Sequence, residues 1–418
     1  MIDVSIVLPC LNESRTLGHC IEGAQRTLDL LKTLHSLAGE IIVADNGSTD
    51  GSQELARRLG ARVVDVSHPG YGAAVCGGFG AARGRYLVMG DADGSYDFLE
   101  AVPMIEALMA GADLCMGSRF KGDIKPGAMP WKNRYFGNPV LTGILNLLFR
   151  AGVDDAHCGL RALTKGCFKR LRLEGSGMEF ASEMVIKAAL LHQRIAEVPV
   201  TLWPDRRDRP PHLRPWRDGW RHLRHLLMLS PYWLFALPAG LVGIVSLAIL
   251  VTMTVTWLSS AEVTRFGNYW AILAGSTFTL SHIGVVLGLA GQLYGIRKRY
   301  RAAPRFLGFL GRWLTLEAML VAGLGGIATG LAILIGVIAY WSAHSLEAIA
   351  NVLPAVLGTC AVAIGMQNIL GGFLLAIVSG NEAEFLRALP SPQWSEEQQL
   401  SSEQPARRRA GAPGDRRL

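Results

Sequence analysis

Four long apolar segments in the second half of the chain restrict its fold more than any other feature. The 418-residue sequence is strongly apolar over residues 232–258, 268–295, 313–341 and 352–378. A helix needs about 20 apolar residues to cross the hydrocarbon core of a bilayer, and each segment is long enough. We therefore predict an all-α transmembrane domain of four helices over residues 231–380. The first half, by contrast, has the composition of an ordinary globular protein.

The distribution of positive charge predicts how these helices are oriented. The formal net charge is +7, and the arginines concentrate at 206–224, at 297–312 and near the C-terminus. These clusters flank apolar segments and do not form one face of a soluble domain, so we expect no nucleic-acid ligand. Attraction to anionic membrane lipids and a pure topology signal both account for them. The positive-inside rule places the loop 296–312 in the cytoplasm, and with it both termini of a multi-pass cell-membrane protein.

Two further segments flank the predicted spans. Residues 211–230 are expected to form an amphipathic interfacial helix, with Trp216 and Trp220 on one stripe and arginines on the adjacent one. The tail 381–418 is rich in Ser, Glu, Gln, Pro and Arg and is predicted to be a disordered cytoplasmic segment. Polar residues inside the spans indicate interhelical hydrogen bonds or interfacial positions, and a translocation path is the alternative. These residues are His282, Gln292, Glu317, Gln367 and Asn368.

Residues 1–210 alternate short apolar strands with longer helical stretches, near 14–34, 51–59, 71–82 and 97–110. The predicted strands are Val4–Leu8, Glu40–Ala44, Arg62–Val66, Tyr86–Met89 and Asp113–Met116. This alternation predicts an α/β domain with a parallel sheet covered by helices on both faces, and ligands of such sheets bind at the carboxyl ends of the strands. The chain enters its first strand without a leader, and its seven cysteines lack C-x-x-C spacing. Both features indicate a cytoplasmic domain with reduced thiols.

Polar motifs follow three of the predicted strands. They are Pro9-Cys10-Leu11-Asn12-Glu13, then Asp45-Asn46-Gly47-Ser48-Thr49-Asp50-Gly51, then Gly90-Asp91-Ala92-Asp93-Gly94. The first two offer acceptors for the base and ribose of a nucleotide, although the same residue types are common in ordinary turns. Two carboxylates one residue apart suit Mg²⁺ or Mn²⁺, which completes its shell with substrate phosphates. The sequence therefore predicts a nucleotide site with a divalent cation held by Asp91 and Asp93.

Together with residues further along the chain, these motifs resemble glycosyltransferase family 2. The later residues are Gly117-Ser118-Arg119-Phe120, Pro126-Gly127-Ala128-Met129-Pro130, Asn133-Arg134, Gly137-Asn138-Pro139 and Asp155-Ala156-His157-Cys158-Gly159-Leu160-Arg161. The combination is similar to the dolichyl-phosphate mannose synthase and polyprenyl-phosphate glucosyltransferase branch, over about residues 1–230. The resemblance implies a GT-A (nucleotide-diphospho-sugar transferase) domain. It also implies inverting transfer of a hexose from UDP-glucose or GDP-mannose to a polyprenyl phosphate.

The resemblance also implies roles for individual residues. Asp91 and Asp93 would hold the metal and diphosphate, and Arg119 and Arg134 would bind the phosphate of the lipid acceptor. The residues that would hold the nucleotide are Pro9, Asn12 or Glu13, Asp45 and Ala92. The chemistry of the arginines agrees with this assignment because a guanidinium matches phosphate oxygens, although a surface salt bridge is the alternative for each one.

Four other charged residues are expected to support the site. An ion pair between Asp155 and Arg161 would order a loop. Glu179 and Glu183 lie four residues apart on a predicted helix that starts near Met178, so they share a face and would brace the loop that binds the acceptor.

Two other functions stay open at this point. A processive membrane polysaccharide synthase also joins this fold to membrane helices, but the Q-x-x-R-W motif of such enzymes is absent from the sequence. A non-catalytic membrane scaffold would not need both aspartates and both arginines. The sequence does not decide the sugar, the nucleotide, the polyprenol, Mg²⁺ against Mn²⁺, the role of the extra helices or homo-oligomer formation.

Overall fold

The computed structural model describes residues 2–206, 215–259, 266–303, 311, 314–347 and 350–385, with the side chains of 215–218 left out. The chain divides into two compact units. The first unit comprises Met1–Leu241 and Lys298–Ala302, and the second comprises Val242–Arg297 and Ala303–Leu418. The predicted tail lies outside the described residues from position 386 onward, so its disorder stays a prediction.

A seven-stranded sheet with the order β3-β2-β1-β4-β6-β5-β7 forms the centre of the first unit. The strands are β1 (Val4–Cys10), β2 (Gly39–Asp45), β3 (Arg62–Asp65), β4 (Tyr86–Met89), β5 (Leu114–Ile124), β6 (Arg161–Thr164) and β7 (Ile195–Leu202). β1 runs parallel to both β2 and β4, and Cys10 lies level with Asp45. The carboxyl ends of these three strands therefore meet at one edge of the sheet, where ligands of such sheets bind.

The expectation of a uniformly parallel sheet is wrong at β6, which runs antiparallel to both β4 and β5. Neither β6 nor β7 was predicted. β6 is only four residues long and begins with Arg161, and β7 contains Pro199 and is mostly half-buried, so neither shows a clear apolar run. The reversal has a consequence for the site. Arg161 pairs with Met89, the last residue of β4, and the loop before β6 therefore reaches the edge where β4 ends.

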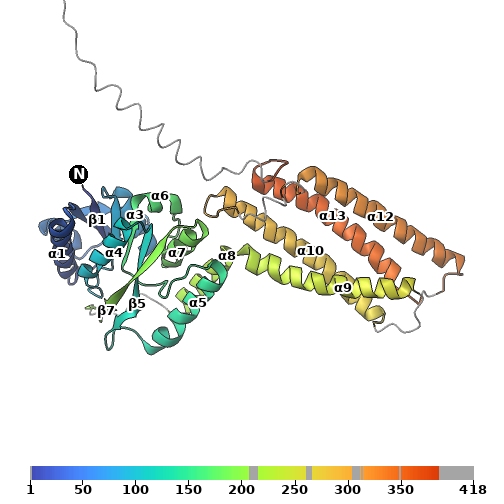
Figure 1. Ribbon diagram of the computed structural model, residues 1–418, viewed down its shortest axis with the longest axis horizontal. Helices are drawn as coiled ribbons and strands as arrows, with labels where there is room; N and C mark the ends of the chain where they lie inside the picture. The colour runs from blue at the N-terminus through green and yellow to red at the C-terminus, as the bar shows by residue number, and fades with distance from the viewer. Residues whose placement is uncertain are drawn as a thin grey trace, which may run out of the picture. The chain divides into compact units, whose positions relative to one another are not determined.

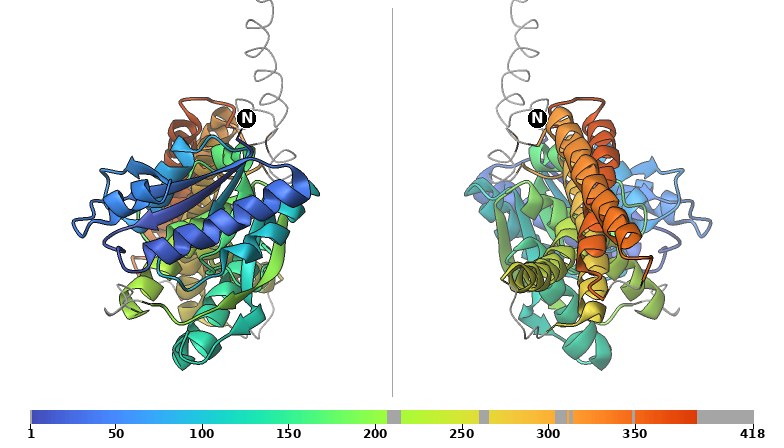
Figure 2. Two further views of the ribbon diagram at one scale, coloured as in Figure 1. Left: turned by 90° about the vertical axis from the view of Figure 1, so that its left-hand side faces the viewer. Right: turned by 90° about the vertical axis from the view of Figure 1, so that its right-hand side faces the viewer.

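Helices cover both faces of the sheet (Figures 1 and 2). The dark blue α1 (Leu17–His35) crosses one face in the left view of Figure 2 and shares a core with α4 (Ala101–Met109). The opposite core is built by α3, α5, α6, α7 and α8. Side chains alternate along β1, so Ile6 contributes to the first core and Val7 to the second. The remaining bounds are α2 (Ser52–Arg58), α3 (Tyr71–Ala81), η1 (Phe98–Glu100), η2 (Asn133–Gly137), α5 (Asn138–Phe149), α6 (Lys165–Leu171), α7 (Phe180–Leu190), α8 (Pro215–Met228) and η3 (Tyr232–Ala236).

The second unit is built from the long helices α9 (Leu237–Leu258), α10 (Asn268–Arg297), α12 (Leu316–Ala343) and α13 (Leu353–Ser379). Within the described residues four helices are long and apolar enough to cross a membrane, as predicted, the first of them counted from Tyr232. α12 and α13 pack closely through glycines. A Cβ on Gly323 would lie 2.7 Å from the carbonyl oxygen of Gly365, so small residues let the two backbones approach.

The polar residues of the spans fit the predicted packing roles in part. His282 Nδ1 on α10 lies 2.9 Å from Gln367 Oε1 on α13, which is an interhelical hydrogen bond, and Glu317 lies in the first turn of α12. Gln292 differs, because its buried Oε1 has no hydrogen-bond partner among the described residues.

The segment Lys298–Ala302, which directly follows α10, packs into the first unit. Tyr300 joins the core around α7 and α8. Arg301 Nη2 donates to the carbonyl oxygen of Leu229 at 2.6 Å, and the Ala302 N–H donates to Leu190 at 3.1 Å. A segment packed in this way has to lie on the same side of a bilayer as the first unit. That this side is the cytoplasm stays a prediction of the positive-inside rule.

We predict that a membrane-impermeant maleimide added to intact cells labels a cysteine at His344 and does not label one at Ala303. Both positions are exposed in the structure, but four spans with a cytoplasmic first unit place them on opposite sides of the membrane. Labelling of Ala303→Cys after permeabilisation is the control for reactivity. Equal labelling of both variants in intact cells would contradict the four-span orientation.

Candidate active site

Asn12 joins the loops that follow β1 and β2. Its φ of 57° lies in the left-handed region, which asparagine tolerates better than most residues. Its backbone N–H donates to Ser48 Oγ at 2.9 Å, and its Oδ1 accepts from the Thr49 N–H at 2.8 Å. The side chain of Asn12 therefore shapes the predicted nucleotide edge by holding two loops together.

Asp45, the last residue of β2, is buried and has one carboxylate oxygen that lacks a partner. Its Oδ2 accepts from the backbone N–H groups of Gly47 and Ser48, each at 3.0 Å, and from Gln53 Nε2 at 2.7 Å. Its Oδ1 is buried and has no hydrogen-bond partner among the described residues. Leaving a buried acceptor unpaired is costly, so this atom marks a position where a ligand donor fits.

Thr16 connects the loop after β1 with the acidic loop after β4. Its hydroxyl lies 3.3 Å from Oε2 of the buried Glu13 and 2.7 Å from the carbonyl oxygen of Ala92. Pro9, one residue before the end of β1, pairs in register with Ala44. The structure thus brings together the residues predicted on the nucleotide side. Thr16 was missed because a threonine just before a helix is read as a cap.

Asp91 and Asp93 are each fixed by a neighbouring hydroxyl. The Tyr71 hydroxyl donates to Asp91 Oδ1 at 2.8 Å, and the Ser95 hydroxyl donates to Asp93 Oδ1 at 2.6 Å. Burial, and secondly the charge of Asp91, hold the pKa of Tyr71 well above its ordinary value, so its hydroxyl stays a donor. A Cβ on Gly159 would lie 2.3 Å from Asp91 Oδ2. The loop before β6 therefore closes directly onto this carboxylate.

The donor set at Asp91 and Asp93 suits a hard divalent cation that is shared with a substrate. In the part of the chain that the structure describes, no group of three or more His, Cys, Asp or Glu residues could hold a metal ion. Mg²⁺ and Mn²⁺ do not need such a group, since one or two carboxylates and the oxygens of a diphosphate complete the shell. The two aspartates fit this pattern, and a structural zinc site of four protein ligands does not.

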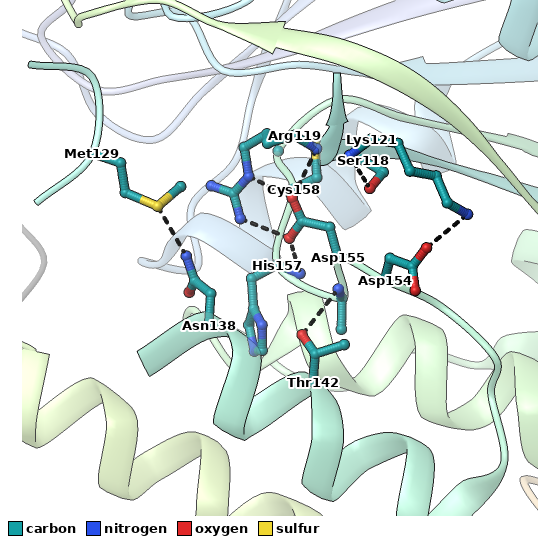
Figure 3. A network of polar contacts seen from close by, with 12 residues as sticks. Ser118, Arg119, Lys121, Met129, Asn138, Thr142, Asp154, Asp155, His157 and Cys158 are labelled. Carbon is teal, nitrogen blue, oxygen red and sulfur yellow. Dashed lines mark hydrogen bonds and ion pairs between the residues drawn. The ribbon is translucent and has the colours of Figure 1, made fainter. Parts of the chain in front are cut away.

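Arg119 on β5 forms a buried, bidentate ion pair with Asp155 (Figure 3). Nε and Nη2 of Arg119 donate to Oδ2 and Oδ1 of Asp155 at 2.6 and 2.7 Å, and the backbone N–H of Arg119 adds a third contact at 3.1 Å. The expected pair between Asp155 and Arg161 is therefore wrong. Arg161 is fully buried and donates to the carbonyl oxygens of Ala156, Cys158 and Ala181. Both arginines thus order the loop before β6, but only Arg119 does so through a carboxylate.

Arg134 differs from Arg119 in its surroundings. It lies in η2, is half-buried and stacks 5.6 Å from the ring centre of Tyr135. Its backbone N–H donates to the carbonyl oxygen of Pro130 at 3.0 Å. Its guanidinium makes no ion pair or hydrogen bond with the described residues, and it acts on the charge of Asp123, whose pKa is lowered first by Lys125 and to a lesser extent by Arg134. Tyr135 and its neighbour Phe136 are 69% and 70% exposed. Arg134 is therefore a cation beside an exposed aromatic surface, in a different segment from the carboxylates.

Glu179 and Glu183 stabilise the loop before α7, which begins at Phe180. Glu183 accepts from the backbone N–H groups of Glu174 and Gly175 and pairs with Lys187 at 2.6 Å. Glu179 accepts from the Gly177 N–H at 2.9 Å. The carbonyl oxygen of Ser176 in the same loop accepts from Ala73 on α3, the helix that begins with Tyr71. These glutamates therefore support the tyrosine that holds Asp91.

Comparison with known proteins identifies relatives for both units. The chain matches the family model described as "Glycosyl transferase family 2" over residues 5–172, and the model described as "Glycosyltransferase family 2 C-terminal transmembrane region" over residues 289–379. It is 35% identical over 376 residues to the low-salt glycan biosynthesis hexosyltransferase Agl6 of Haloferax volcanii, a match that covers 89% of this chain and 88% of that protein.

Other similar proteins match about half of the chain or less. A dolichyl-phosphate hexose transferase of Haloferax volcanii is 29% identical over 201 residues, or 47% of this chain and 82% of that protein. A polyprenol monophosphomannose synthase of Mycolicibacterium smegmatis is 32% identical over 174 residues, or 38% and 65%. A crystal structure of glucosyl-3-phosphoglycerate synthase from Mycobacterium tuberculosis with Mn²⁺ and UDP is 22% identical, with a TM-score of 0.42 over 54% of this chain and 79% of that chain.

We predict that Asp155→Ala lowers the free energy of unfolding of the first unit by about 3–5 kcal/mol, because it leaves the buried Arg119 without a counter-charge. Asp154→Ala is the matched control. Asp154 is the preceding residue, its side chain is 58% exposed and it pairs with Lys121, so its loss should cost about 1 kcal/mol or less. Denaturant unfolding of the detergent-solubilised protein, followed by tryptophan fluorescence, measures both. Equal stability of the two variants would contradict the assignment.

Proposed function

The chain belongs to glycosyltransferase family 2, and from this premise we propose that it transfers one hexose, with inversion, from a nucleotide-sugar to a polyprenyl phosphate at the cytoplasmic face of the membrane. It is a hexosyltransferase with a C-terminal transmembrane region. UDP-glucose and GDP-mannose are the proposed donors. The observation that carries the proposal is Arg134, whose guanidinium makes no hydrogen bond or ion pair with the described residues and lies beside exposed aromatic side chains.

Asp45 supports a nucleotide-sugar as the donor. Its buried Oδ1 lacks a partner within the described residues, and an imino N–H of uracil or of guanine would supply the missing hydrogen bond. Pro9 and Glu13 lie on the neighbouring strand end and loop, next to the proposed base. The same acceptor serves either base, so it does not select between the two donors.

Asp91 and Asp93 would hold Mg²⁺ or Mn²⁺ together with the donor diphosphate, and Ala92 between them would line the nucleotide. When bound, the cation supplies neutralisation of the charge on the departing diphosphate. The contribution of the chain itself is orientation. Tyr71 and Ser95 donate to the two carboxylates, which fixes their rotamers before the donor arrives and reduces the entropy cost of binding.

The proposed acceptor needs no strong general base. A sugar hydroxyl has to lose a proton as it attacks, whereas a phosphate monoester with a second pKa near 6 is largely dianionic at pH 7. Arg119 and Arg134 would orient this dianion toward the anomeric carbon. Asp155 occupies Nε and Nη2 of Arg119, while its Nη1 makes no hydrogen bond with the described residues and is available to a phosphate oxygen.

The surface around Arg134 supports an acceptor that lies in a membrane. Trp131, Tyr135 and Phe136 are 68–70% exposed, which is costly for large apolar side chains that face water. The helix that follows, α5, contacts α8, and α8 leads along the chain into the first span at Tyr232. A bilayer interface would cover these aromatic groups and bring lipid phosphates to the arginine.

We expect the purified full-length protein, in vesicles that contain polyprenyl phosphate, to form a lipid carrying a single sugar. Mild acid should release that sugar, because a sugar phosphodiester is labile, and dephosphorylated polyprenol should not serve as an acceptor.

Arg134→Ala should raise the KM for the lipid phosphate by about one to two decades, through loss of a charge-assisted contact. Arg58→Ala on α2 is the control. A ladder of longer saccharides would identify a processive synthase instead.

We also predict that Asp45→Asn weakens binding of the nucleotide-sugar by about tenfold or more. The amide NH₂ that replaces Oδ1 is a hydrogen-bond donor, and it would face the imino N–H of the base, which is also a donor. Asp65→Asn is the matched control because Asp65 lies level with Asp45 on the neighbouring strand and is exposed. Isothermal titration with UDP and with GDP measures the effect. Unchanged affinity in Asp45→Asn would remove this residue from the nucleotide site.

A further inference from the structure

The buried His222, the half-buried His157 and the buried Ser182 connect α8 with the loop before β6. Ser182 Oγ on α7 lies 2.8 Å from His222 Nδ1 on α8 and 3.3 Å from His157 Nε2 in the loop. The two imidazole rings meet edge to face, with their centres 5.0 Å apart. Ser182 is fully buried and His222 is 7% exposed. The three side chains therefore form a continuous polar contact through the second core of the first unit.

The contact is chemically complementary when both rings are neutral. A serine hydroxyl has one proton, so it can donate to one ring nitrogen and accept an N–H from the other ring. Burial, and then the nearby His222, Arg119 and Arg161, hold the pKa of His157 well below its ordinary value, so His157 is neutral near pH 7. Inside a core such a chain fixes the rotamers of all its members.

The loop carries this contact onward to Arg119. His157 lies two residues after Asp155, and its backbone N–H donates to Asp155 Oδ1 at 3.3 Å. In Figure 3 the carboxylate of Asp155 points toward Arg119, while the ring of His157 leaves the same loop in the opposite direction. The carbonyl oxygens of Ala156 and Cys158 are held by Arg161. Displacing the ring of His157 would therefore move a short, tightly held loop together with Asp155.

We propose that His157, Ser182 and His222 are positioning residues. They connect α8, which in this proposal lies at the membrane surface, to the loop of Asp155, and thereby hold the side chain of Arg119 in the orientation that binds the acceptor phosphate. The inference rests on the proposed function. None of the three touches the reacting groups. They make the orientation of Arg119 depend on the position of α8, so that the phosphate site is complete only while α8 is packed against α7. An interfacial helix thereby acts on acceptor binding as well as on attachment to the bilayer.

Steady-state kinetics of the full-length protein in vesicles of fixed lipid composition tests the inference. Ser182→Ala and His222→Leu should each raise the KM for polyprenyl phosphate by about fivefold to tenfold, the loss expected for one buried hydrogen bond, with the KM for the nucleotide-sugar unchanged. His222→Asn keeps an acceptor and donor near the position of Nδ1 and should restore most of the loss. In the double variant Ser182→Ala, His222→Leu the KM for polyprenyl phosphate should rise no further than in the more affected single variant, because either substitution alone already interrupts the contact.

Ser5→Ala is the matched control for general destabilisation. Ser5 is fully buried and makes two hydrogen bonds, to Glu40 and from Gly84, but it lies near the amino end of β1, away from the ligand edge. An equal rise of the acceptor KM in Ser5→Ala, an equal rise of both KM values, or additive effects in the double variant would overturn the inference. A wild-type enzyme that does not use lipid phosphate overturns the proposed function and the inference with it. A wild type that uses lipid phosphate beside variants of unchanged KM overturns the inference alone.

Discussion

The ion pair between Arg119 and Asp155 is the interaction on which the organisation of the site depends. Both side chains are buried, and a charge taken out of water has to be matched by a partner in good geometry. The pair joins β5 to a loop that is separated from it by 36 residues in the sequence. The same loop is held on other sides by contacts with Arg161, Glu197 and Ser182. The loop in turn limits the space beside Asp91.

The antiparallel strand β6 explains how such a loop comes to stand at the ligand edge. In a sheet of parallel strands, the segment before a strand arrives at the opposite edge. Because β6 is reversed between β4 and β5, the chain before it arrives where β4 ends. The loop before β6 therefore contacts both the carboxylate of Asp91, which follows β4, and Arg119 on β5. The parallel strands thus supply the edge at which we propose that the nucleotide binds, and the reversed strand brings in the loop beside which we propose that the acceptor phosphate binds.

Much of this arrangement could be predicted from local sequence, and the rest depends on distant contacts. The four apolar segments and the strands that end in Pro9, Asp45 and Asp91 motifs carry their signal within a few residues, as hydrophobic runs followed by polar turns. The partner of Asp155 could not be read in this way, since Arg119 and Arg161 are equally plausible by charge and only the register of β6 decides. His222 gave no signal either. It lies in a helix interpreted through its tryptophans and arginines, and its contact with Ser182 is across 40 residues.

Gly159 closes the acidic loop in a way that bears on how related chains can vary. Its N–H donates to the Tyr96 hydroxyl at 3.0 Å, and any Cβ at this position would overlap Asp91 Oδ2 and approach Tyr96. A side chain larger than hydrogen can be accommodated here only if the acidic loop stands elsewhere. The identity of this one residue is therefore a marker of the geometry beside it. In a related chain that keeps both aspartates but replaces this glycine, the loop before β6 cannot lie as close to the carboxylate of Asp91 as it does here.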